Sequence, residues 1–118
     1  MDTIYILVRP DTWELAGKTH QFFERSLANE GFIHACHWRQ LDRVANAYFS
    51  DANELVIVAV DPAKVQPPIR WEESPSTGDV YPHIYGILNL DATTEVQRIH
   101  RSQDGRFEIP EKETILQR

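Results

Sequence analysis

The sequence predicts an α+β domain of two small, mostly antiparallel sheets packed together with one or two flanking helices. Short runs of β-branched and aromatic residues recur between turn formers, which is the pattern of short strands. Residues 38–49 carry the clearest helical spacing of apolar side chains. Strands do not alternate regularly with helices, as a parallel sheet of βαβ units requires. With 118 residues the chain has room for one core, so we expect a single domain over 1–110.

The first half of the chain is expected to hold two strands and two helices. Asp11 and Glu14 have the spacing of a capping box, and Gly17 supplies a C-terminal stop, so together they bound a short helix. Gly31 is expected to close a helical turn. In chain order, the expected elements are a strand over 3–8, a helix over 12–16, a loop over 18–30 with a helical turn over 26–30, a strand over 32–36 and a helix over 38–49.

The second half is expected to be mainly extended. The continuous aliphatic run from Glu54 to Val60 indicates a central strand covered on both faces. Asp104-Gly105 is a turn signal between two extended pieces and predicts a hairpin. In chain order, the expected elements are a strand over 54–60, a turn over 61–64, a strand over 69–72, a mobile loop over 74–78, an extended segment over 80–85, a hairpin of 95–100 with 106–109 and a polar tail over 111–118.

Composition argues against several classes of protein. A formal net charge of −6 and a pI near 5.3 disfavour binding to polymeric nucleic acid or to anionic lipid. The single cysteine, Cys36, cannot form an internal disulfide, and the N-terminus has no basic and apolar signal segment. The longest apolar run, residues 55–60, is too short to cross a bilayer. We therefore expect a cytoplasmic protein that does not associate with a membrane.

Strand alternation groups polar residues on common faces, because side chains two apart in a strand point the same way. The groups are Phe32, His34 and Cys36, then Arg70 and Glu72, then His83 and Tyr85. If the three segments converge, they form a pocket with two imidazoles, a guanidinium, a carboxylate and a phenol. That mixture is typical of a ligand site rather than of a core.

Each of these residues also has a purely structural interpretation. His34 has apolar neighbours that suit a neutral ring for ligand recognition or base catalysis, but a half-buried histidine bonded to a backbone carbonyl is equally consistent. Arg70 and Glu72 could hold phosphate and ribose, or form an ion pair on a solvated face. We expect Cys36 to be inert, and the spacing of His34, Cys36 and His37 lacks the second ligand pair of a structural zinc site. No metal is expected.

Five ordered motifs resemble the domain-of-unknown-function 952 family of bacteria and plants, and the similarity spans roughly residues 4–110. They are Gly31-Phe32-Ile33-His34, Val44-Ala45-Asn46, Val60-Asp61-Pro62, Arg70-Trp71-Glu72 and Pro82-His83-Ile84-Tyr85-Gly86. That family is distantly similar to the ADP-ribosyltransferase group, in which two small sheets form a cleft for NAD or an ADP-ribosylated product. The resemblance implies an ADP-ribosyltransferase-like fold and a nucleotide-like ligand.

The resemblance also implies which residues form the site. The family's marked positions fall on His34, Trp71, Glu72, His83, Tyr85 and Gly86, with Asn46 as a support. Two departures count against NAD as the ligand. Ile6 stands where the family usually has a histidine, and Ala35-Cys36 replaces the usual Cys-Ser, which removes a hydroxyl.

The leading hypothesis is a pocket for a nucleotide or ADP-ribose-like small molecule, with transfer or hydrolysis at a ribosyl anomeric carbon. In this hypothesis Glu72 and His34 are catalytic, Arg70 holds a phosphate, and the ligand-binding residues are His34, Arg70, Trp71, His83, Tyr85 and Gly86. A non-catalytic binding or regulatory module is the first alternative, for which Ile6 and Cys36 count as lost catalytic groups. A protein-interaction domain with an exposed apolar patch is the second.

Overall fold

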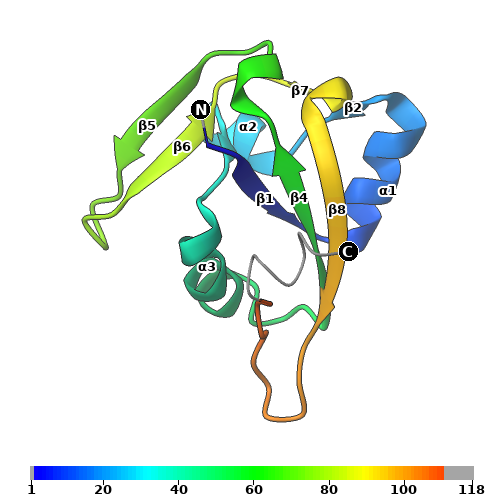
Figure 1. Cartoon of the computed structure of the whole chain (residues 1–118), viewed down its shortest axis with the longest axis vertical. Helices are drawn as coiled ribbons and strands as arrows, with labels where there is room; N and C mark the ends of the chain where they lie inside the picture. Colours follow the sequence, from blue (N-terminus) through cyan, green and yellow to red (C-terminus); the bar gives the residue numbers. More distant parts are fainter. Residues whose placement is uncertain (1, 111–118) are drawn as a thin grey trace.

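The structure is a computed structural model that describes residues 2–110 (Figure 1). Its α-helices are α1 (Pro10–Thr19), α2 (Arg25–Glu30) and α3 (Leu41–Tyr48). Its strands are β1 (Ile4–Val8), β2 (Gln21–Phe22), β3 (Ile33–His34), β4 (Glu54–Val60), β5 (Ile69–Glu73), β6 (Val80–Ile84), β7 (Leu88–Asn89) and β8 (Thr93–His100). Short 3₁₀ turns cover Trp38–Gln40, Pro62–Lys64 and Leu90–Ala92. The predicted polar tail, 111–118, lies outside the described residues.

The predicted α+β class with small antiparallel sheets is confirmed. Strands β1, β4 and β8 form one sheet in the order β1-β4-β8, and β3, β6 and β5 form a second in the order β3-β6-β5. Strands β2 and β7 form a third, two-stranded sheet, so the described residues contain three sheets and three α-helices rather than two sheets and one or two helices. Within residues 2–110 no helix combines the length and apolar character needed to cross a bilayer.

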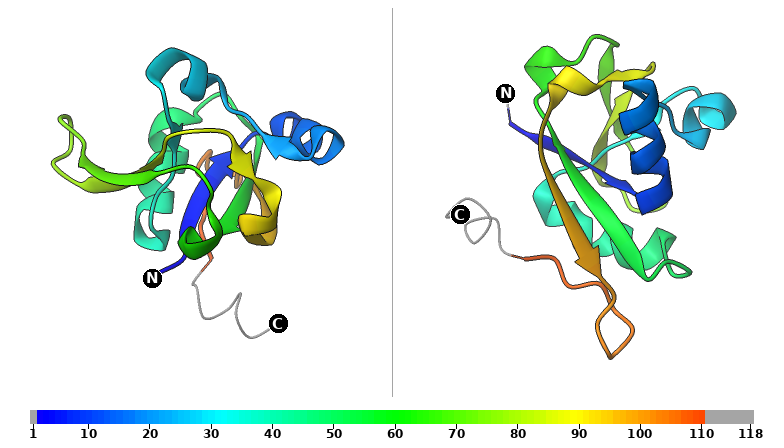
Figure 2. Two further views of the ribbon diagram at one scale, coloured as in Figure 1. Left: turned by 90° about the horizontal axis from the view of Figure 1, so that it is seen from above. Right: turned by 90° about the vertical axis from the view of Figure 1, so that its right-hand side faces the viewer.

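The β1-β4-β8 sheet carries the core on both of its faces. Successive residues of β4 alternate between two clusters of buried side chains, and β1 does the same. One cluster includes Ala16 of α1, and the other includes Leu41 and Ala45 of α3, so the two helices cover opposite faces (Figures 1 and 2). The expectation of a central strand over Glu54–Val60, covered on both faces, is therefore confirmed.

Helix α1 corrects the predicted N-terminal helix at both ends. It begins at Pro10 rather than at Thr12, because proline needs no backbone donor in a first turn and has its φ preset there. Asp11 lies inside the first turn instead of capping it, and Gly17 lies inside the helix. The helix stops where His20 adopts a left-handed φ of 63°.

The segment predicted as a loop over 18–30 contains two short elements, β2 and α2. Its predicted helical turn and closing glycine are confirmed, because α2 ends at Gly31, whose φ is 90° and whose N–H donates to the carbonyl of Leu27. The strand predicted over 32–36 is shorter than expected and covers Ile33–His34. Two-residue strands carry too little periodicity to be distinguished from loops in a sequence.

The strands predicted over 54–60 and 69–72, the turn over 61–64 and the extended segment over 80–85 correspond to β4, β5, a 3₁₀ turn and β6. The helix over 38–49 is present as a 3₁₀ turn followed by α3. The chain reverses around Asp104-Gly105 as predicted, with Gly105 at φ 87°. The prediction of a second hairpin strand over 106–109 is wrong, because the only bridge that the described residues form there joins Phe107 to Arg101. Phe107 is instead held by Asn46 of α3, which bonds to both its backbone N–H and its carbonyl.

Candidate functional site

The β3-β6-β5 sheet has one apolar face and one polar face. On the apolar face Ile33 and Ile84 are opposite each other and fully buried, with Ile69 opposite Ile84 on the other side. One residue along each strand, His34, His83 and Arg70 form a row across the sheet. Side chains of directly opposite residues share a face, so this row lies on the side turned away from the core. We call this the site face.

Pro82 explains why β3 ends after two residues, which lets the chain turn to pair with β1. Its carbonyl accepts a hydrogen bond from Ala35, but its nitrogen has no hydrogen to return, so the ladder between β3 and β6 stops after His34. Cys36 then pairs with Tyr5 of β1 through two N–H···O bonds of 2.8 Å each. These two bonds join the segment after β3 to β1, and so connect the β3-β6-β5 sheet to the β1-β4-β8 sheet.

Glu72 is the centre of a hydrogen-bond network on the site face. Its Oε1 atom accepts a bond of 2.5 Å from the Tyr85 hydroxyl and one of 2.8 Å from Nδ1 of His83. These two bonds, the one from Tyr85 foremost, lower the pKa of the Glu72 carboxyl below its ordinary value. The same contact raises the pKa of the Tyr85 phenol. Glu72 is therefore a fixed, ionised carboxylate.

The imidazole of His83 is enclosed by aromatic rings. The ring of Phe32 stacks on it with centroids 4.0 Å apart and planes 16° from parallel. Phe32 also lies 5.3 Å from the ring of Tyr85, and the His83 side chain is only 13% exposed. Phe32 was predicted to share the face of His34 but not to belong to the site, although its place two residues before His34 was a usable signal.

His34 and Arg70 complete the polar row at its two ends. His34 lies edge-on to His83 with centroids 5.4 Å apart, and its Nε2 lies 3.2 Å from both carboxylate oxygens of Glu30. Its side chain is 56% exposed, so it contacts solvent far more than His83 does. The guanidinium of Arg70 lies 5.1 Å above the Tyr85 ring. Glu30 was missed by the sequence analysis, although it ends α2 four residues before His34.

Comparison with known proteins decides the family. The family model described as protein of unknown function (DUF952) matches residues 7–96. This chain belongs to the DUF952 family. The crystal structure of protein CC0527 from Caulobacter crescentus superposes with a TM-score of 0.80 at 27% identity, covering 91% of this chain and 94% of that one. The solution structure of the same protein gives a TM-score of 0.76 at 26% identity, covering 90% and 91%.

These comparisons place the DUF952 chain in a structural family without assigning it an activity. A double variant of CC0527 also matches, with a TM-score of 0.79 at 27% identity. No curated protein matches the sequence. The chemistry of this DUF952 protein must therefore be argued from its own residues.

Two residues that were expected at the site, Trp71 and Gly86, lie elsewhere or have other partners, and Cys36, which strand alternation grouped with His34, lies in the core. Trp71 points to the opposite face of β5, where it pairs with Pro82 and is 43% exposed. Cys36 lies buried in the core under α3, and burial raises the pKa of its thiol to about 12, which agrees with the expected inert side chain. Gly86 lies against Pro67, whose Cβ would be 2.8 Å from a Cβ at position 86. Packing alone accounts for that glycine.

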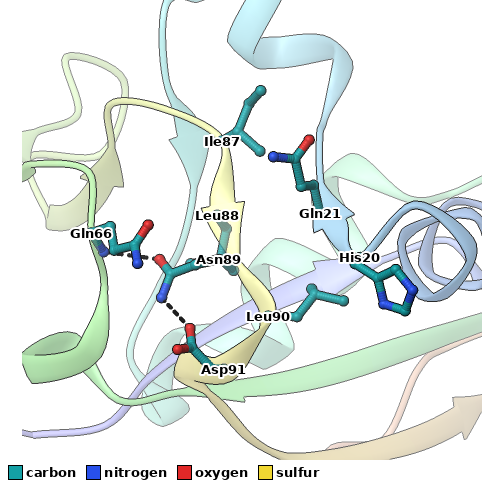
Figure 3. A pocket seen from close by; sticks show the side chains of 8 residues that line it. All are labelled: His20, Gln21, Gln66, Ile87, Leu88, Asn89, Leu90 and Asp91. Carbon is teal, nitrogen blue, oxygen red and sulfur yellow. Dashed lines mark hydrogen bonds between the residues drawn. The ribbon is translucent and has the colours of Figure 1, made fainter.

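A separate hollow of about 400 Å³ lies beside β2 and β7 and does not include the site face (Figure 3). Asn89 lines this hollow. Its side chain accepts a hydrogen bond from the Gln66 N–H and donates to the Lys64 carbonyl and to Asp91. These bonds fix the turn between β7 and β8. Across residues 2–110, the DUF952 fold brings no three His, Cys, Asp or Glu side chains close enough to hold a metal ion.

Proposed function

We propose that the site face binds a phosphorylated ribose compound of the nucleotide or ADP-ribose type and acts on its ribosyl anomeric carbon as a hydrolase or transferase. The observation that carries this proposal is the shared oxygen of Glu72. Because Tyr85 and His83 both donate to Oε1, the carboxylate is held with its second oxygen, Oε2, directed away from them. Within residues 2–110 that second oxygen has no hydrogen-bond partner, so it is available to a ligand.

A fixed carboxylate suits this chemistry because positive charge develops on the ribose as the leaving group departs. Glu72 Oε2 can stabilise that charge or accept a hydrogen bond from a ribose hydroxyl. The lowered pKa of the Glu72 carboxyl keeps it ionised near neutral pH. The cost of ordering the carboxylate is met before the ligand arrives, which is the advantage of a preorganised site.

His83, rather than His34, is the better proton acceptor. A carboxylate only accepts hydrogen bonds, so Nδ1 of His83 donates to Glu72, and Nε2 is the ring nitrogen that can accept a proton from a ligand. The stacked Phe32 ring fixes the orientation of that imidazole. His34 is more exposed and its Nε2 is already held by Glu30, so we assign it to ligand contact.

The reaction follows from these positions. The bond between the anomeric carbon and the leaving group breaks, and both electrons leave with that group. A water or acceptor hydroxyl forms the new bond to the carbon, and its proton passes to Nε2 of His83. Arg70, at the edge of the same face, holds the phosphate of the ligand.

The residues of the site face fit one ribose and one phosphate rather than a whole NAD molecule. The resemblance to the ADP-ribosyltransferase group would place a polar residue of the first strand against the nucleotide. Here Ile6 is 1% exposed, lies opposite Val58 and belongs to the core. We therefore propose no reaction through NAD, and the expected substrate is a ribose phosphate that carries a leaving group on its anomeric carbon, such as AMP, whose adenine leaves as the free base.

Thermal-shift measurements with ribose 5-phosphate, AMP, ADP-ribose and NAD test the proposal. We expect at least one of the first three to raise the melting temperature, because a ligand that binds only the folded state stabilises it. Glu72→Gln should abolish the shift. Glu73→Gln is the matched control, since it makes the same chemical change one residue along β5, on the opposite face.

Turnover of the ligand that binds then separates the enzyme from the binding module. Release of free base or of a second ribosyl product, measured by chromatography, should be lost in His83→Gln and kept in Glu73→Gln. Binding without turnover would favour a non-catalytic regulatory module. If none of the four compounds raises the melting temperature, the proposal is contradicted and the hypothesis of a protein-interaction domain remains.

A further inference from the structure

The outer edge of β5 is an open sheet edge. In the order β3-β6-β5, strand β5 pairs only with β6, and it lies at the outside of the molecule (Figure 1). Among residues 2–110, no backbone group pairs with its outer side. Such an edge offers a row of unpaired N–H and C=O groups to another strand.

The pairing with β6 determines which backbone groups point outward. Tyr85 N–H donates to the carbonyl of Pro68, and these two residues are opposite each other in the register. Because hydrogen-bonded and non-bonded pairs alternate in an antiparallel ladder, residues 70 and 72 also face β6 with their backbone groups. The backbone N–H and C=O groups of Ile69, Trp71 and Glu73 therefore point away from the sheet.

The side chains of β5 are as unusual for a free edge as its backbone. Trp71 is 43% exposed on the face opposite the site, although tryptophan is among the residues most often buried in contacts. On the site face Arg70 and Glu72 carry opposite charges two residues apart. The site face of β5 thus has one positive and one negative charge placed symmetrically about residue 71, while Glu73 lies on the other face, so the site-face pattern is complementary to a second copy of itself.

Only three registers are open to such self-pairing. Directly opposite residues must share a face, and outward backbone groups must meet outward groups, so the two-fold axis passes through a residue; an axis at 70, 71 or 72 pairs at least three residues of each five-residue strand. An axis at Arg70 sets two guanidinium groups opposite each other, and an axis at Glu72 sets two carboxylates opposite each other. An axis at Trp71 sets each Arg70 opposite the partner's Glu72 and pairs the two tryptophans. Charge therefore selects the register centred on Trp71.

The other long edge strand does not have this property. In β8, an axis at Val96 sets Glu95 opposite Gln97, and an axis at Gln97 sets Glu95 opposite Ile99. Neither register brings opposite charges together. Glu95 and Arg98 of β8 lie on opposite faces, so no register that keeps the faces together sets these two charges opposite each other, and β8 lacks the pattern found in β5.

We infer that two copies of this chain associate by antiparallel pairing of β5 with β5, centred on Trp71, into a continuous six-stranded sheet. Trp71 and the partner's Trp71 exchange two backbone hydrogen bonds, and Ile69 bonds with the partner's Glu73. The pair of Arg70 and the partner's Glu72 is of the non-bonded kind, in which side chains approach most closely. Each site face therefore gains the partner's Arg70 beside its own Glu72.

That last consequence rests on the proposed function, whereas the association itself does not. A second guanidinium beside Glu72 would strengthen the hold on a phosphorylated ligand, so each site would be completed by the other subunit. The interface is built on one five-residue strand, which puts it at the small end of specific interfaces. We expect a dissociation constant of roughly 10–100 µM.

Sedimentation equilibrium of the full chain over a range of concentrations tests the association. The wild type should pass from monomer to dimer, and Arg70→Glu should remain monomeric because two carboxylates then face each other across the axis. The double exchange Arg70→Glu with Glu72→Arg should restore the dimer while leaving the ligand site destroyed. Lys64→Glu, an equal change of charge on an exposed side chain away from β5, should dimerise as the wild type does.

Amide hydrogen exchange gives a second readout that needs no substitution. Raising the protein concentration should slow exchange at Ile69, Trp71 and Glu73 and leave Arg70 and Glu72 unchanged. A chain that stays monomeric at every concentration, or a dimer that persists in Arg70→Glu, would overturn the inference. A wild-type chain that forms the dimer but binds none of the four compounds would contradict the proposed function alone, because association and ligand binding are measured separately.

Discussion

The two three-stranded sheets of this protein use their faces differently. Strands β1 and β4 are buried along almost their whole length, and each of their faces packs against a helix-covered cluster. In strand β5 only Ile69 and Glu72 are partly buried, and the fully buried isoleucines of its sheet, Ile33 and Ile84, both lie on one face. Strands β1 and β4, covered on both sides, carry no charged side chain except Glu54 at the start of β4. The one-sided sheet is anchored by its isoleucines and leaves a whole face for Glu72, His83 and Arg70.

The largest effect that separates the two sheets is expected in the core of β4. Leu55 is fully buried, so Leu55→Ala should destabilise the protein by about 2–5 kcal/mol, the sum of lost transfer energy and the cavity left behind. Val96→Ala in the neighbouring strand is the control, because Val96 is 48% exposed and its loss should cost less than about 0.5 kcal/mol. Urea denaturation measures both. Similar costs at the two positions would contradict the division between the buried central strand and the exposed edge strand β8 of this sheet.

The core sheet could be predicted from sequence because its signal is local and continuous. Seven consecutive residues of β4 gave the bounds of that strand and its burial on both faces. The site face was predictable only in part. Alternation grouped Arg70 with Glu72 and His83 with Tyr85, but their meeting depends on the register of β5 with β6, which no single segment encodes.

The sequence predictions that failed also have specific structural causes. Strand alternation placed Cys36 on the face of His34. Pro82 instead ends the pairing of β3 with β6, and the chain then turns so that Cys36 pairs with β1. Trp71 was expected at the site from the family resemblance, although strand geometry puts it on the face opposite Glu72. The contact of Phe32 with His83 joins β3 to β6 and was not predictable without their pairing.

A buried amide should connect the two regions more strongly than an exposed ion pair does. Gln40 is 3% exposed, and its amide nitrogen donates to Asp79 at 2.8 Å and to the Val80 carbonyl at 3.0 Å, which fastens the β5-β6 hairpin to the start of α3. Gln40→Met should cost about 1–3 kcal/mol, because it removes both hydrogen bonds of this buried amide. The exposed Arg39 contacts the same carboxylate, yet Arg39→Met should cost no more than about 1 kcal/mol.

Urea denaturation of the two variants makes this comparison directly. An equal loss of stability would mean that the charge of Asp79, rather than the burial of Gln40, connects the hairpin to the rest of the protein. Hydrogen exchange in β6 gives the local readout, since Gln40→Met should loosen that strand before it loosens β4.

The smallest expected effect is a dependence of stability on pH that arises at the same carboxylate. The bond from Gln40, followed by that from Arg39, lowers the pKa of Asp79 from 3.8 to about 2. A group whose pKa is lower in the folded state stabilises that state when it is ionised. The contribution of Asp79 should therefore be complete above its unfolded pKa and should disappear as the pH falls through its folded pKa.

Asp79→Asn tests that sign, because asparagine cannot ionise. The wild type should be more stable than the variant at neutral pH, and the difference should shrink as the pH falls from about 4 towards 2. The difference is the quantity to follow, since the lowered pKa values of Glu72 and Asp104 add their own acid sensitivity to both proteins equally. A difference that stays constant down to pH 2 would show that Asp79 acts through hydrogen-bond geometry and not through its charge, so that the two regions are joined by polar packing alone.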